Sequence, residues 1–163
     1  MGIMLEIDKT DLNIVNLLME DGRMSASEIA RRVSNISERA VRYRIERMVE
    51  QGLIKVTAVV NPRVLGYGVV ADVWLEVESD SIQAVAEKMT SFECVSYVAY
   101  SIGETDVSVQ VIARDNAEVY RFVTEIIGRT HGVRKTTTSI VPRVLKDVYQ
   151  WRIPDSSVED LGK

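Results

Sequence analysis

The sequence predicts an α+β protein built from two successive domains, and three observations lead to that prediction. Residues 25–54 read as two capped helices joined by a short turn. After residue 62 the apolar pattern changes from a helical period of about 3.6 residues to the alternation expected of strands. The elements of the second half follow the order βαββαβ, which predicts a four-stranded sheet with two helices.

The first half of the chain is predicted to hold three helices. Asp8 can cap a first helix over residues 9–20, which carries too many apolar residues to lie alone on a surface. Ser25 followed three residues later by Glu28 forms a capping box, which satisfies orphan amides at a helix start. The first helix is therefore expected to support the two that follow it.

The third helix is expected to begin after Ser37, to run over roughly residues 38–51 and to end at Gly52. Three apolar side chains recur at helical spacing on its predicted buried side: Val41, Ile45 and Met48. The opposite side is expected to expose Arg39, Tyr43, Glu46 and Arg47, with Arg42 and Arg44 on its flanks. Four arginines within nine residues thus share one helix.

These arginines suit a nucleic acid partner. A guanidinium group matches phosphate oxygens and guanine edges with two parallel hydrogen bonds, which favours arginine over lysine at such positions. An amphipathic helix with a solvated basic face is the alternative. The capped tight turn and the β-rich run at residues 55–60 favour a winged helix-turn-helix on double-stranded DNA, whose contacts are predicted to be Ser25, Ser37, Arg39, Arg42, Tyr43, Arg44 and Arg47.

Composition and charge agree with this division of the chain. The net charge is −4, yet residues 23–63 hold nine Arg and Lys against four Asp and Glu, while residues 64–163 hold ten against fifteen. With 46% apolar residues and no membrane-length apolar run or secretory signal, the protein is expected to be globular and cytoplasmic without a membrane partner. The single cysteine, Cys94, is expected to pack as a small hydrophobe.

The domain boundaries are predicted from prolines and glycines, which interrupt helices and strands. Residues 1–61 are predicted to form the DNA-binding domain, and residues 62–68, with one proline and two glycines, the hinge. Residues 69–145 are predicted to form the second domain, for ligand binding and oligomerisation. Strands are expected there at 69–78, 95–102, 106–113 and from 133 to about Pro142, and helices at 81–89 and 116–128. Residues 146–163 are predicted to be an extension in which Tyr149 and Trp151 cover apolar surface of the sheet.

With both halves placed, residues 5 to 142 resemble the Lrp/AsnC family, the feast/famine regulators. The resemblance is carried by the stretches IDKTDLNIVNLLMEDGRMSASEIA, ISERAVRYRIERMVEQGLI and NPRVLGY and by the loop GETD. It implies a transcription regulator with a winged helix-turn-helix and an ACT-like second domain that pairs into homodimers and often octamers. In the family an amino acid commonly binds between dimers, which here implies Gly103, Glu104, Thr105, Asp106, Ser139 and Ile140 as effector-binding residues.

The chemistry of the loop is compatible with such a ligand. Gly103 lets the backbone approach a ligand without a Cβ, and the Asp106 carboxylate can accept hydrogen bonds from an ammonium group. A plain hairpin turn with two exposed acids is the alternative, which corresponds to a regulator without an effector.

Two other functional classes are open. Some tetrapyrrole (sirohaem) decarboxylases share this architecture, but the only histidine, His131, is expected in a turn, and no catalytic, metal-binding or cofactor-binding pattern is present. An amino-acid sensor or assembly module without DNA contact is the third class, and the arginines of the third helix argue against it. We therefore expect no enzyme activity, no metal and no cofactor.

Overall fold

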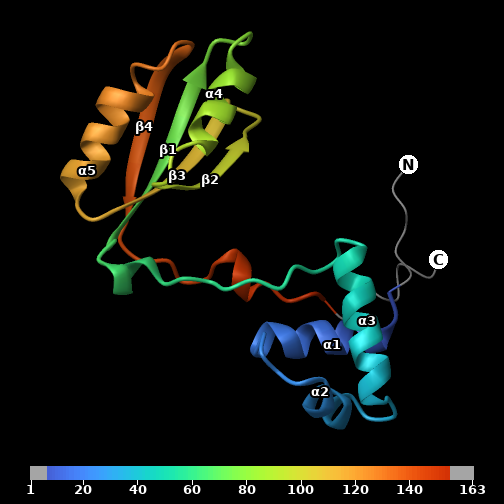
Figure 1. Cartoon of the computed structure of the whole chain (residues 1–163). Coiled ribbons are helices and arrows are strands. Elements are labelled where there is room, and N and C mark those ends of the chain that lie inside the picture. The colour runs from blue at the N-terminus through green and yellow to red at the C-terminus, as the bar shows by residue number, and fades with distance from the viewer. Residues whose placement is uncertain (1–6, 155–163) are drawn as a thin grey trace. The chain divides into compact units, whose positions relative to one another are not determined.

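The computed structural model describes residues 7–154, and within them the chain forms two compact units (Figure 1). The helical unit consists of the described residues up to Val59 together with those from Leu145 onward, and the sheet unit is Val60–Val144. Residues 155–163 of the predicted extension lie outside the described residues.

The described residues of the helical unit include three α-helices: α1 (Lys9–Glu20), α2 (Ala26–Val33) and α3 (Glu38–Glu50). Each begins where the sequence predicts, because the side chains of Asp8, Ser25 and Ser37 accept hydrogen bonds from backbone amides of the first turn. Gly52, with φ +71°, adopts the left-handed conformation just after α3. The helices share one apolar core, made by Ile14, Val15, Ile29, Val41 and Met48.

The segment predicted as the strand of the wing does not pair within the described chain. Lys55 to Val60 follows α3 and belongs to no strand. Its side chains are exposed, including Val56, Val59 and Val60. A strand needs a neighbouring strand to satisfy its backbone groups, and this segment is not part of the sheet that the described residues form. The winged helix-turn-helix class is confirmed, whereas the strand itself is not formed here.

The predicted βαββαβ order is confirmed in the sheet unit. Its four strands lie in the spatial order β2-β3-β1-β4, and every neighbouring pair is antiparallel. The elements are β1 (Val69–Val77), α4 (Ile82–Thr90), β2 (Val95–Tyr100), β3 (Val107–Ala113), α5 (Asn116–Arg121), η2 (Phe122–Ile127) and β4 (Val133–Val141).

The helices of the sheet unit cover one of the two faces of the sheet. Alternate residues of β1 and β3 are buried under α4, α5 and η2 in one apolar core. Residues of β1 that point to the other face are half-buried, among them Val70, Asp72 and Trp74. The helices of the sheet unit thus leave one face of the sheet open.

The second helix of the sheet unit differs in its winding from the prediction. A single helix was expected over 116–128, but after Arg121 the chain widens into the π-helical segment η2, where the amide of Gly128 donates to the carbonyl of Val123. Val123 and Ile127 remain buried, so both side chains still pack into the core of the sheet unit across the change of winding.

The expected role of the C-terminal extension is wrong. Tyr149 and Trp151 were predicted to cover the sheet, but they are 59% and 56% exposed, Tyr149 within the short 3-10 helix η3 (Val148–Gln150) and Trp151 directly after it. Ile153 instead packs against the core of the helical unit, and Arg152 lies 3.6 Å from Glu20. The core of the helical unit offered apolar contacts to the extension that the pattern of the tail alone does not reveal.

Candidate nucleic-acid interface

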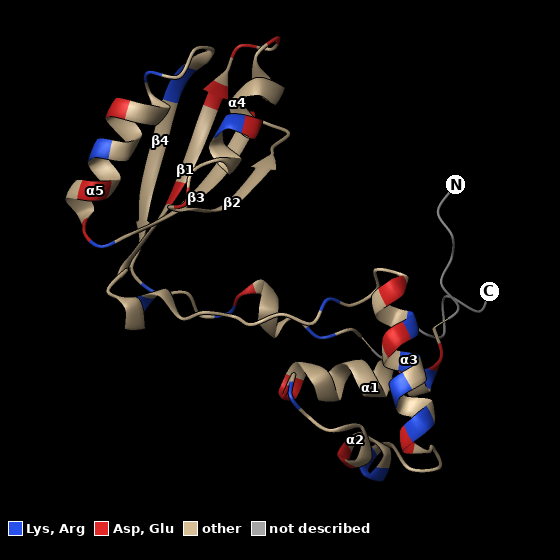
Figure 2. Ribbon diagram, in the orientation of Figure 1, with Lys and Arg blue, Asp and Glu red and all other residues tan. Residues whose placement is uncertain are grey.

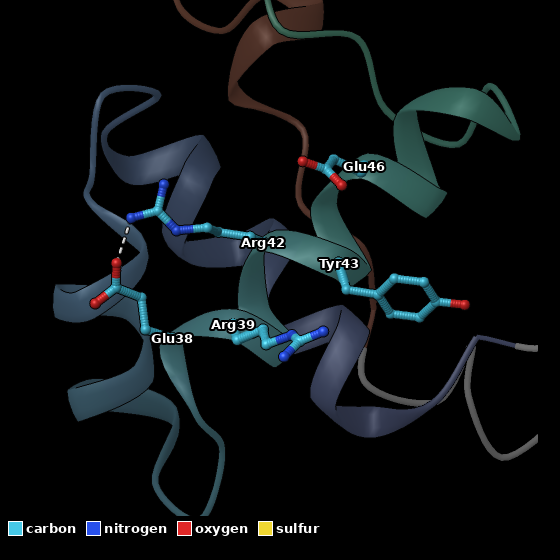
Figure 3. Close-up of a pocket in the computed structure, with 5 residues that line it drawn as sticks. All are labelled: Glu38, Arg39, Arg42, Tyr43 and Glu46. Carbon is cyan, nitrogen blue, oxygen red and sulfur yellow. Dashed lines mark hydrogen bonds and ion pairs between the residues drawn. The ribbon is translucent and has the colours of Figure 1, made fainter.

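The exposed side of α3 presents Arg39, Arg42 and Tyr43 to solvent (Figure 3). Together with Glu38 and Glu46 they line a shallow hollow of about 590 Å³. Tyr43 is 64% exposed although it is aromatic, and Arg39 has no ion-pair partner among residues 7–154. This surface offers hydrogen-bond donors and one aromatic ring to a partner outside the chain.

Arg42 is held along the helix by Glu38, four residues earlier, as the dashed line in Figure 3 marks. The Glu38 carboxylate raises the pKa of Arg42 above its usual value by hydrogen bonding and by charge. Both side chains are largely exposed, so the pair is weak in water and can exchange for a phosphate oxygen. Arg42 therefore remains available to an anionic partner.

Arg44 and Arg47 do not share this exposed side, contrary to the prediction for Arg47. Nη1 of Arg44 lies 2.7 Å from Oδ2 of Asp8 and 2.8 Å from Oδ1 of Asp11. Nη2 of Arg47 lies 2.5 Å from Oδ2 of Asp11. The two arginine side chains are 25% and 30% exposed, and that of Asp11 only 1%. We call these four residues the aspartate–arginine clamp.

The two aspartates of the clamp are themselves fixed at the start of α1. The Asp11 amide donates to Oδ1 of Asp8 at 2.8 Å, and the Asp8 amide donates to Oδ2 of Asp11 at 3.2 Å, which is a reciprocal capping box. The sequence prediction treated Asp8 only as a cap and assigned Asp11 no role. One signal in the sequence could have revealed the clamp. Asp8 and Asp11 are three residues apart, and so are Arg44 and Arg47.

The charges of the clamp influence one another. Burial by itself disfavours the charged form of Asp8, but the Asp11 amide and the Arg44 guanidinium outweigh it and hold the pKa of Asp8 below its usual value. Asp11 and Asp8 in turn raise the pKa of Arg44. Figure 2 shows basic bands of α3 alternating with acidic ones, and α3 itself carries Glu38, Glu46 and Glu50.

The two serines predicted to touch DNA lie at helix starts. Oγ of Ser25 accepts from the Glu28 amide at 3.2 Å, and Oγ of Ser37 accepts from the Ala40 amide at 3.2 Å. Both serines are exposed, and a hydroxyl that accepts one hydrogen bond can still donate another. Their position at helix N-termini also suits an anionic group.

In the sheet unit, Gly103, Glu104, Thr105 and Asp106 form the loop between β2 and β3, as predicted. Gly103 has a φ of +141°, a conformation that residues with a side chain rarely adopt. The carboxylate of Asp106 is not a free group at the end of the loop, because its Oδ2 accepts from the amide of Val77 at 2.7 Å. Asp106 thus ties the loop to the end of β1.

Ser139 and Ile140 lie elsewhere on the sheet. They pair with Asp72 and Ala71 on β1, five positions or more from Val77, to which Asp106 is bonded. At about 3.3 Å per residue this corresponds to roughly 16 Å along the strand. One copy of the chain therefore does not bring the six predicted effector-binding residues together.

The remaining chemically interesting residues form no recognisable centre. His131 is exposed and lines a hollow of about 190 Å³ with Ser81 and Lys88. Cys94 packs at the edge of the sheet core, and its burial raises the pKa of the thiol. Within residues 7–154, no three His, Cys, Asp or Glu side chains gather as metal ligands would, and no helix combines the length and apolar content needed to cross a membrane.

Two family models match the chain. Residues 7–55 match a winged helix-turn-helix DNA-binding model, and residues 70–151 match the Lrp/AsnC ligand binding domain. The second match extends through most of the described extension. The first covers all of α1, α2 and α3, and hence both the exposed arginines and the clamp.

Curated relatives are similar over most of their length. An HTH-type transcriptional regulator of Pyrococcus horikoshii is 38% identical over 143 residues, which is 87% of this chain and 90% of the relative. The HTH-type transcriptional regulator LrpA of the same organism is 33% identical over 141 residues, 86% of this chain and 99% of the relative.

Solved structures share the fold. AsnC of E. coli superposes with a TM-score of 0.80 at 23% identity over 88% of this chain and 98% of its own. A transcriptional regulator of Neisseria meningitidis, solved as a complex with L-Met, gives a TM-score of 0.81 at 25% identity over 86% of this chain and 93% of its own.

Proposed function

Because the chain belongs to the Lrp/AsnC family of DNA-binding transcription regulators, we propose that α3 enters the major groove of operator DNA with Arg39, Arg42 and Tyr43 as its contacts. The observation that carries the proposal is the exposed side of α3, where these three side chains point into solvent (Figure 3). A helix of this kind fits the major groove, where a guanidinium can bind a guanine edge or a phosphate.

The proposed contact set is smaller than the one the sequence predicts. Arg44 and Arg47 are left out because their guanidinium groups are bound to Asp8 and Asp11. Ser25 and Ser37 are kept as phosphate contacts at the starts of α2 and α3. Arg39 is the strongest candidate for base contact, since no side chain of the described residues holds it.

Binding to a selected DNA duplex tests this assignment. The duplex is chosen from a random-sequence pool by the wild-type protein. Arg39→Ala should weaken binding to it by about 1 to 3 kcal/mol, and relaxed specificity at one position would indicate a base contact. Arg121→Ala, which removes the same charge from an exposed position on α5, is the control and should bind as the wild type does. Equal affinities of wild type and Arg39→Ala would contradict the proposal.

We further propose that the sheet unit pairs with a second copy through its open face. The half-buried Trp74 and Val70 of β1 and the exposed Tyr97 of β2 supply apolar surface there without a covering helix of the sheet unit. Apolar surface of this kind favours self-association in a two-fold dimer. Trp74→Asp should lower the assembly size in sedimentation velocity, and an unchanged size would contradict the proposed face.

An amino acid bound between subunits is the proposed effector. The support is the distance within one chain between the Asp106 loop and Ser139, because a site that uses both must take them from different copies. The Neisseria meningitidis relative was solved as a complex with L-Met. A ligand changes DNA binding only if it binds one assembly better than another, which suits a site at a subunit contact.

A thermal-shift screen with the amino acids, L-Met first, tests the effector proposal. A ligand present at 100 times its Kd stabilises the native state by about 2.7 kcal/mol. Asp106→Asn keeps an oxygen acceptor for the Val77 amide but loses the charge, so it should lose the response without losing the fold. Glu125→Gln, on the exposed side of η2, is the matched control. No response to any amino acid would indicate a regulator without such an effector.

A further inference from the structure

We infer that Asp11 is a positioning residue for DNA recognition, which holds Arg44 and Arg47 away from the DNA and fixes the rotation of α3 so that Arg39 and Arg42 face outward. The inference rests on the proposed function of α3. It goes beyond it because it assigns sequence discrimination to a residue of α1 that never touches DNA.

The geometry of the clamp sets the rotation of α3 about its axis. Each oxygen of the Asp11 carboxylate binds a different arginine, Oδ1 to Arg44 and Oδ2 to Arg47. The two arginines are three residues apart and lie on one side of the helix. Turning α3 by one residue, about 100°, would withdraw both guanidinium groups from Asp11. The side that carries Arg39 and Tyr43 is thereby fixed as the outer side.

Asp11 is suited to this role because its own position is fixed. Its backbone amide is bonded to Asp8, and its carboxylate accepts from the Asp8 amide. Its side chain is almost entirely buried, so water does not compete for its oxygens. Asp8 is half-exposed and pairs with Arg44 alone of the two arginines, which makes it the weaker acid of the clamp.

The clamp also sets how many charges α3 offers to DNA. Two arginines face two aspartates, so the four residues carry no net charge. Sequence-independent binding grows with the number of phosphates that a protein neutralises, and each added contact steepens the plot of log K against log salt by about 0.9. Specificity is the difference between the affinity for the selected sequence and the affinity for other sequences. Arginine side chains freed to bind the DNA phosphates would therefore reduce it. Both arginine side chains already reach the surface in part and could turn outward if freed.

Asp11→Asn tests the inference in the full-length protein. The measured quantities are the Kd for the duplex selected by the wild type, the Kd for the unselected random pool, and the salt dependence of each. We expect tighter binding to the pool, a steeper salt dependence and a specificity ratio about tenfold lower, which corresponds to 1.4 kcal/mol. Loss of sequence preference with a gain of general affinity is a result that simple loss of fold does not produce.

Asp21→Asn is the matched control. It makes the same change of charge at an exposed acid of the helical unit, and its amide oxygen can still accept from the Arg23 amide. It should leave the specificity ratio unchanged. Equal ratios for Asp11→Asn and wild type, or equal losses in Asp11→Asn and Asp21→Asn, would overturn the inference.

Asp8→Asn keeps the test decisive if Asp11→Asn does not fold. It frees Arg44 from one of its two acids at a half-exposed position, so it should lower the specificity ratio in the same direction by a smaller factor. No change of ratio in a folded Asp8→Asn protein would then count against the inference. A wild-type protein that selects no sequence from the pool would contradict the proposed function itself, which separates the two failures.

Discussion

Arg39 and Arg42 lie on the outer side of α3, whereas Arg44 and Arg47, each five residues further along, are bound to the first turn of α1. All four are the same residue type on one short helix. Their environments differ because Asp11 is buried beside one pair, while Arg42 has only Glu38 of its own helix and Arg39 has no such partner among the described residues.

The difference shows that a basic helix has two kinds of arginine. A guanidinium paired with a buried carboxylate stabilises the fold and is costly to release, because the carboxylate would remain without a partner away from water. An exposed guanidinium contributes little to stability and is free to bind an anion. Stability and DNA affinity should therefore respond to different arginines of α3.

The largest expected effect is that of Asp11→Ala, which removes the shared acid and leaves two arginine side chains without it. Breaking a buried pair costs about 3 to 5 kcal/mol, and the partial exposure of both arginines lowers the expected loss to about 3 kcal/mol. Urea unfolding followed through the helical content measures it. A loss below about 0.5 kcal/mol would show that the clamp contributes nothing to stability.

Arg47→Ala should cause the next largest loss of stability, and it distinguishes the two kinds of arginine most directly. Asp11 keeps Arg44, so we expect a loss of about 2 kcal/mol, while Arg39→Ala should remain within about 0.5 kcal/mol of wild type. The same unfolding measurement serves both variants. Equal stabilities of Arg39→Ala and Arg47→Ala would remove the distinction on which the comparison depends.

Acid should loosen the clamp through Asp8. The pKa of Asp8 is lowered in the folded protein, so its contribution to stability is fully present above the unfolded value of about 3.9 and is lost as the pH falls through the lower folded value. Between pH 7 and 5 this contribution should be constant. Melting temperatures of wild type and Asp8→Asn should therefore converge in acid, and parallel curves down to pH 2 would contradict the assignment.

Glu38→Gln should have the smallest effect and concerns the outer side alone. It removes the charge that holds Arg42 along the helix, and exposed pairs of this kind contribute little to stability. Stability should hardly change, and DNA binding should tighten slightly because a negative charge near the phosphates is removed. Weaker binding would show that Glu38 itself contacts a base, a role for which cytosine offers a donor.

Features that depend on interactions between residues close in sequence could be predicted from the sequence. The start of each N-terminal helix was predictable from Asp8, Ser25 and Ser37, because a cap and its amide lie within three residues. The βαββαβ order was predictable from alternation and turn residues. Patterns that repeat locally need no knowledge of the rest of the chain.

The contacts that decide the site are not local. Arg44 and Arg47 meet Asp11 across more than 30 residues of sequence, and the helical period only says that they lie on a common side. The occupied carboxylate of Asp106 depends on the end of β1. The missing strand at residues 55–60 depends on a partner that the described chain does not supply. In each case the contact partner is distant in the sequence, and the local pattern does not reveal it.

The docking of Ile153 also changes the topology of the protein. The chain leaves the helical unit near Val59 and returns to it near Leu145, so the sheet unit is an insertion between two parts of the helical unit. Ile153 and the Arg152 to Glu20 ion pair close this path into a loop without a covalent bond. A protease cut at residues 55–60 would therefore leave the docked end as the contact that joins the two fragments, and it would remove the tether that gives this end a high effective concentration at its binding site.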